Sequence, residues 1–101
     1  MDINVMTKEF DTAEGREFLI GEFNANKTHA AIAWSQCKNH RNSNAKYKSG
    51  VSMEAFWLSK YYGIIFENEC IAKILKELGM PEYWDEAMSA SYSKWITTAC
   101  N

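Results

Sequence analysis

Cysteine and histidine are the residue types in this sequence whose spacing suggests chemistry. Cys37 and His40 have two residues between them, which is the spacing of half of a structural zinc site. Such a site needs four ligands, and the remaining candidates, His29, Cys70 and Cys100, are isolated in the sequence. The pattern favours a buried thiol beside an exposed imidazole at a helix end, and we expect no metal.

A nucleophilic cysteine or a pair of carboxylates could form the active site of an enzyme. A Cys–His nucleophile is recognised by its geometry with a third orienting group, and the sequence around Cys37 and His40 indicates no such group. Glu67 and Glu69 are two residues apart, and such neighbours do not share a helix face. The chain also has no glycine-rich phosphate loop, nucleophile elbow or metalloprotease motif. We expect a protein that is not an enzyme and needs no cofactor.

The charge distribution points to binding. The net charge of −2 hides an acidic segment over residues 1–26 (net −4), a basic one over 27–60 (net +5) and an acidic one over 61–101 (net −3). In the basic segment, cations flank one aromatic ring; cations neutralise phosphates or acidic surfaces, and the ring can stack on an unpaired base. The candidate partner-binding residues there are Lys38, His40, Arg41, Lys46, Tyr47 and Lys48. The alternative is a solvated loop whose charge only balances the acidic segments.

Two adjacent aromatic pairs add further candidates. The two pairs are Tyr61 with Tyr62 and Tyr83 with Trp84. Within each pair, the two adjacent side chains cannot both point inward from one helix. Tyr62 and Tyr83 are therefore candidate exposed contacts, since tyrosine is common in binding hot spots. The alternative is a ring that lies flat on the protein surface.

Composition and length limit the class of protein. The chain has 101 residues, of which 47% are hydrophobic, enough for one domain with a real core. The three cysteines are an odd number and are widely spaced, which is typical of reduced thiols. No signal peptide is visible, and the apolar stretch over residues 61–66 is too short to cross a bilayer. We expect a cytoplasmic protein without membrane contact.

Helix signals position the candidate residues. The first helix is predicted from residue 12 to about residue 23, capped by Asp11, and it should end at Asn24-Ala25-Asn26. A second helix, capped by Asn26 or Thr28, should lead into an exposed loop over residues 39–50. Ser52 should cap a third helix.

The second half of the chain carries a strong helix stop. Leu78-Gly79-Met80-Pro81 should close one helix, and the last helix should start near Pro81. The apolar stripes predicted to be buried contain Phe18, Phe23, Trp34, Phe56, Trp57, Ile71, Leu75, Trp84 and Trp95.

The fold class that follows is all-α: a compact bundle of about five helices in one domain over residues 1–101. Residues 2–6 are expected to form a short extended arm, and an α+β fold is the alternative if they find a partner strand.

The function that follows is that of a small interaction protein. Small size, charge blocks and surplus aromatics favour binding to another protein, as in inhibitors of host machines encoded by phages or mobile elements. The alternative is a nucleic-acid-binding protein that uses residues 38–48.

Overall fold

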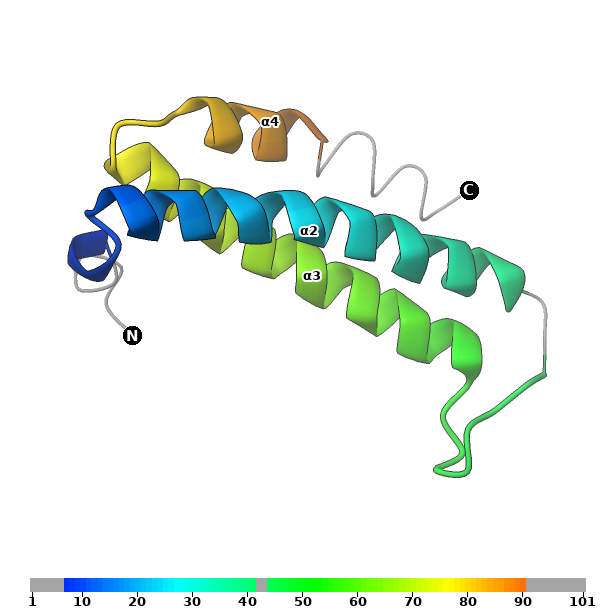
Figure 1. Ribbon diagram of the computed structural model, residues 1–101. Coiled ribbons are helices and arrows are strands. Elements are labelled where there is room, and N and C mark those ends of the chain that lie inside the picture. Colours follow the sequence, from blue (N-terminus) through cyan, green and yellow to red (C-terminus); the bar gives the residue numbers. More distant parts are fainter. Residues whose placement is uncertain (1–6, 42–43, 91–101) are drawn as a thin grey trace.

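Two long antiparallel helices form the frame of the protein (Figure 1). The computed structural model describes residues 7–41 and 44–90. Helix α2 (Ala13–Asn39) follows one helical turn at residues 7–9, and α3 (Met53–Glu77) runs back alongside it. The short α4 (Glu82–Ala90) folds back at the end of the hairpin formed by α2 and α3. The all-α class is confirmed, and the described residues form no strand.

The first two predicted helices are one helix, so the expected break at Asn24-Ala25-Asn26 is wrong. Asn26 is buried, and its Nδ2 donates a hydrogen bond to Glu67 Oε2 at 3.3 Å. Asn68 Nδ2 donates across the same interface to the Phe23 carbonyl at 3.1 Å. Packing against α3 therefore outweighs the weak helix propensity of asparagine. Helix α3 also continues without a break, so the described residues form fewer helices than the about five predicted.

The helix ends mostly follow the predicted signals. Thr12, not Asp11, caps α2 by accepting a hydrogen bond from the Gly15 N–H at 2.9 Å. Ser52 caps α3 as predicted, since its hydroxyl accepts a hydrogen bond from the Ala55 N–H at 3.0 Å. Each cap satisfies one backbone donor that the first helical turn leaves without a partner.

The predicted stop after α3 is confirmed. Gly79 has a φ of 89°, in the left-handed region that glycine adopts without strain. The Gly79 N–H donates to Lys76 O at 3.0 Å, and the Met80 N–H donates to Leu75 O at 2.9 Å. This pair of bonds is a Schellman motif, and it turns the chain into α4.

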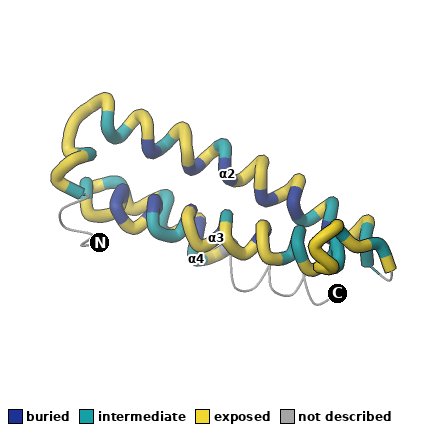
Figure 2. Tube along the Cα trace, turned by 90° about the horizontal axis from the view of Figure 1, so that it is seen from below, coloured by how far each residue is buried: buried dark blue, intermediate teal, exposed yellow. Residues whose placement is uncertain are grey.

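Buried residues recur along the edges of α2 and α3 that face each other (Figure 2). One cluster lies at the α4 end and contains Leu19, Phe23, Ile71, Ala72, Ile74, Leu75 and Ala87. The second cluster lies nearer the connection between α2 and α3 and contains Ala30, Ala33, Tyr61 and Ile65. The core is therefore two-part, with α4 covering only the first cluster.

The aromatic stripes are only partly buried. Phe23 is buried as predicted, whereas Phe18 is 57% exposed, so the expectation that it is a core residue is wrong. The Phe18 ring stacks on Phe10, with centroids 6.1 Å apart. Ile71 and Leu75 are buried as predicted, while the half-buried aromatics are Trp34, Phe56, Trp57 and Trp84. Trp95 and the predicted arm at residues 2–6 lie outside the described residues.

None of the helices in the described part of the chain has the length and apolar character needed to span a membrane.

Candidate binding surface at the hairpin tip

The connection between α2 and α3, residues 44–52, is called the tip below. Most of its residues are exposed, as the sequence predicts for the loop over residues 39–50, and it contains a hydrogen-bonded turn. The Tyr47 N–H donates to Val51 O at 3.0 Å, the Gly50 N–H donates to Tyr47 O at 2.9 Å, and Lys46 forms an antiparallel bridge with Ser52. Gly50 has a φ of 88°, which is the left-handed residue of a three-residue hairpin loop. The tip therefore has a defined backbone.

Tyr47 anchors the tip to the start of α3. Its half-buried ring packs on Phe56 with centroids 4.8 Å apart, and Phe56 in turn meets Trp57 edge-on at 5.4 Å. The residues on either side, Lys46 and Lys48, are exposed. Neighbours in an extended segment point to opposite sides, so the inward tyrosine directs both lysines outward. The tyrosine acts as a support for the lysines, and its ring is not a free stacking surface.

The Arg41 side chain contacts one residue of α3 and one residue of α2. Its Nε is 3.9 Å from Glu54 Oε2, and its guanidinium carbon lies 5.7 Å from the centre of the Trp34 ring. An ion pair at the surface is worth at most about 1 kcal/mol, so it orients Arg41 without removing its charge from reach of a partner. Of the predicted cations, Arg41 is therefore the one most engaged in structure.

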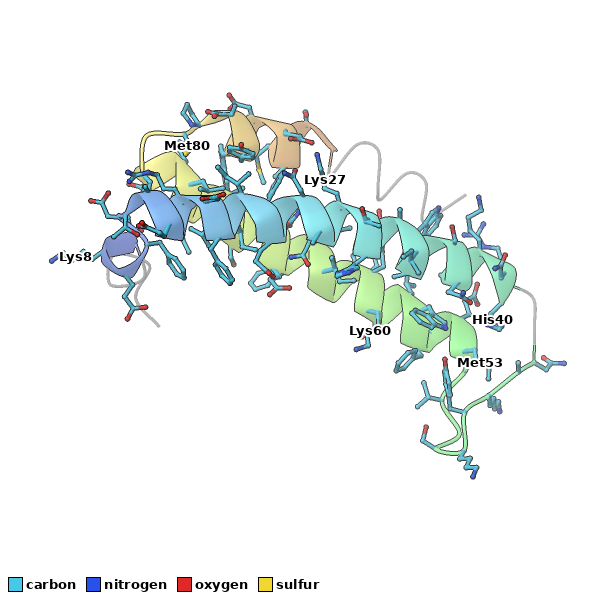
Figure 3. The ribbon with its side chains drawn as sticks, in the orientation of Figure 1. Lys8, Lys27, His40, Met53, Lys60 and Met80 are labelled. Atoms are coloured by element: carbon cyan, nitrogen blue, oxygen red, sulfur yellow. The ribbon has the colours of Figure 1, made fainter. Side chains whose placement is uncertain are left out.

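Lys38 and His40 end α2 beside the tip (Figure 3). Lys38 is exposed in the last turn, where a cation is favoured by the negative end of the helix dipole. His40 is the C-cap, and its backbone N–H donates to Gln36 O and Cys37 O, both at 3.2 Å. The folded chain thus brings the six predicted residues between positions 38 and 48 together at one end of the hairpin.

Cys37 is a packing residue in this structure. It is buried, and burial first and the nearby Glu54 second raise the pKa of its thiol, while Arg41 acts in the opposite sense. A raised pKa keeps the thiol protonated and unreactive near neutral pH. Cys70 is half-buried and free, and Cys100 lies outside the described residues. Among the described residues, no three ligand-type side chains cluster to hold a metal ion.

The two remaining candidates do not join the tip. Tyr62 is 40% exposed and packs edge-on against Tyr61, whose pKa is raised by burial and by Tyr62 itself. Tyr83 lies on α4, where its half-buried ring meets Phe23 edge-on at 5.3 Å. The expectation that Tyr83 is an exposed contact is therefore wrong, because α4 uses it to close the core.

Two grooves along the hairpin were missed by sequence reasoning. One has a volume of about 330 Å³ and is lined by His29, Ile32, Ala33, Trp57, Lys60 and Ile64. The other, of about 260 Å³, is lined in part by Phe18, Glu22, Glu67 and Cys70. The grooves are lined by a mixture of apolar and polar residues beside the buried stripe, and this mixture gives no regular signal in the sequence.

No protein-family description, curated protein or solved structure matches this chain.

Proposed function

We propose that this protein is a non-enzymatic interaction module whose tip binds an acidic surface on another protein. The observation that carries the proposal is the anchoring of Tyr47 on Phe56, at 4.8 Å between ring centres, which leaves Lys46 and Lys48 exposed. Lys38 adds a third exposed cation at the adjoining end of α2. Cations held on an ordered support lose little conformational freedom on binding.

Charge also separates the tip from the rest of the protein. The described residues 7–26 hold five acids against two bases and include the start of α2, and the acidic α4 lies at the same end of the hairpin. A basic tip at the opposite end steers an acidic partner toward itself and disfavours approach at the α4 end. This asymmetry gives the complex a defined orientation.

A protein partner is favoured over nucleic acid by two contacts. The Tyr47 ring is packed on Phe56, so it is poorly placed to stack on an unpaired base. Arg41 keeps its charge but is oriented by Glu54 and Trp34, so its guanidinium is less free to turn toward a phosphate than the exposed lysines are. Nucleic acid is the second candidate, and its binding should weaken steeply as salt concentration rises.

The biological setting is part of the same proposal. A small protein that acts by occupying an acidic surface suits an inhibitor of a host machine encoded by a phage or mobile element, acting in the cytoplasm. The thiols support this setting, since Cys37 and Cys70 are free.

Affinity purification tests the proposal. The tagged protein, a tip variant (Lys46→Glu with Lys48→Glu) and a control (Lys8→Glu with Lys73→Glu) are used to capture partners from lysate, with and without nuclease. The control changes the net charge equally at exposed lysines outside the tip. We expect one stoichiometric protein to bind the original chain and the control but not the tip variant.

Other results decide against the proposal. Equal capture by the tip variant, or no stoichiometric protein at all, would refute binding through the tip. Capture that depends on the tip but disappears after nuclease treatment would favour the nucleic-acid alternative.

A further inference from the structure

Helix α4 covers only one side of the hairpin. Lys27 points toward α4, where its Nζ pairs with Glu86 Oε1 at 2.7 Å, whereas Lys60 projects on the other side (Figure 3). The helical repeat places Glu22 and His29 on the side of α2 away from Lys27. Both grooves described above open on this side, which we call the open face.

The α2 part of the open face carries large apolar side chains in water. Phe18 is 57% exposed and Ile32 is 51% exposed, and both line a groove. The stripe they belong to alternates steps of four and three residues: Phe18, Glu22, Ala25, His29, Ile32 and Gln36. This spacing is that of a helix seam that packs against another helix.

The α3 part has the same spacing and carries two opposite charges. Its stripe is Trp57, Lys60, Ile64, Glu67, Ile71 and Ile74, in alternating steps of three and four. Lys60 and Glu67 are the exposed members, and they are seven positions apart, which is about two helical turns. They lie on either side of the middle of α3 (Met53–Glu77). Beside that middle is Gly63, where the position of a Cβ atom meets open space.

We propose that the open face binds a second copy of this chain in antiparallel orientation, forming a dimer with two-fold symmetry. In that orientation α3 of one copy lies along α3 of the other with direction reversed. Lys60 then meets Glu67 of the second copy, and Glu67 meets Lys60 of the second copy. Because the two charges flank the middle of α3, the register that pairs them also overlaps α3 along most of its length.

Charge selects this orientation over the parallel one. In a parallel dimer of the same faces, α3 would lie over α2 of the second copy. Lys60 would then lie level with the region of Trp34, since Trp34 packs on Tyr61, and would find no carboxylate there. Unpaired charges at an interface oppose association.

The open face is large enough for a specific dimer. In this register the two-fold axis lies between Lys60 and Glu67, so α3 overlaps α3 of the second copy over about 22 residues, and the shared surface is about 30 Å long and 20 Å wide. That is about 600 Å² from each copy, which is at the lower limit of specific interfaces. The exposed Ile32 lies within this overlap and would supply an apolar contact there.

Sedimentation velocity and light scattering over a wide range of concentration test the proposal. The original chain should reach twice its mass of 11.6 kDa. Lys60→Glu and Glu67→Lys each place like charges across the interface, so each should raise the dimer dissociation constant at least about tenfold. An equimolar mixture of these two variants should form a heterodimer, and the double variant Lys60→Glu/Glu67→Lys should form a dimer again, because both restore opposite charges.

Lys73→Glu is the matched control, since Lys73 is an exposed lysine of α3 outside the stripe. It should dimerise like the original chain. Circular dichroism should show all variants folded, and Glu67→Lys and the double variant should be less stable because they lose the hydrogen bond from the buried Asn26 to Glu67. A chain that stays monomeric at every concentration would overturn the proposal. Failure of either the mixture or the double variant to restore association would also overturn it, because antiparallel pairing requires both rescues.

Discussion

At the α4 end of the hairpin three helices surround the larger hydrophobic cluster, whereas at the tip end only α2 and α3 meet. The first cluster has five large apolar residues beside two alanines, whereas the second has only Tyr61 and Ile65 beside the alanines Ala30 and Ala33. The α4 end is acidic, and the tip end is basic. We expect the α4 end to supply most of the folding stability, whereas the tip end carries the groups proposed to bind a partner.

Removing a large side chain from each cluster tests this division with the largest expected effect. Leu75 is completely buried, so Leu75→Ala should cost about 4 kcal/mol of unfolding free energy. Ile65→Ala, in the cluster nearer the tip, should cost about 2 kcal/mol because fewer helices enclose it. Urea unfolding followed by circular dichroism measures both losses, and equal losses would remove the distinction between the ends.

The turn into α4 provides the next test. Gly79 has a φ of 89°, so Gly79→Ala should lower the unfolding free energy by about 1–2 kcal/mol through left-handed strain. Gly21→Ala is the matched control, because Gly21 lies inside α2 with open space at its Cβ. That control should stabilise the protein by about 0.5–1 kcal/mol. Thermal unfolding should therefore shift in opposite directions for the two variants.

The tip should be separable from the core. Tyr47→Ala removes the ring contact with Phe56 and should lower the unfolding free energy by only about 1 kcal/mol. Amide hydrogen exchange at Tyr47 and Met53, which bond across the tip, should nevertheless become much faster. Unchanged exchange at these two amides would show that Tyr47 does not hold the tip.

The smallest effect concerns pH. The pKa of the Cys37 thiol is raised in the folded chain, so the unfolded chain loses this proton first as pH rises. The contribution of the Cys37 thiol to folding stability is fully present below pH 9.0, the ordinary thiol pKa. It is lost as the pH rises toward the raised pKa of the thiol in the folded chain. Unfolding free energy should therefore fall above about pH 9, and less so in Cys37→Ala. An unchanged slope in that variant would assign the effect to other groups, such as Tyr61.

Local signals predicted the helix ends better than the helix number. Ser52 and the Gly79 stop act through bonds to their own neighbours, so the sequence contains the whole cause. The predicted break at Asn24-Ala25-Asn26 is wrong because hydrogen bonds to α3 stabilise this part of α2. Asn26 bonds to Glu67, and the Phe23 carbonyl accepts a bond from Asn68. Glu67 and Asn68 are more than 40 residues further along the chain. Asparagine is a turn former by propensity, and a tertiary contact reverses the outcome.

The candidate site shows the same limit. Charge alone located Lys38, Lys46 and Lys48, because lysines seldom become buried. Tyr47 packs inward on Phe56, and the exposed Phe18 stacks on Phe10. Residue spacing along one helix does not predict either contact. Tyr83 was predicted to be exposed because α4 has two adjacent aromatic residues, and both are used to cover the core.

The most direct test exchanges charge at the two ends and compares partner capture. Lys46→Glu with Lys48→Glu alters the tip, while Glu82→Lys with Asp85→Lys alters the exposed acidic start of α4 by the same number of charges. The quantity measured is the amount of partner protein that remains bound per mole of each variant. Loss of binding for the tip variant with retention for the α4 variant is the predicted result. Retention for the tip variant with loss for the α4 variant would contradict the assignment of binding to the tip.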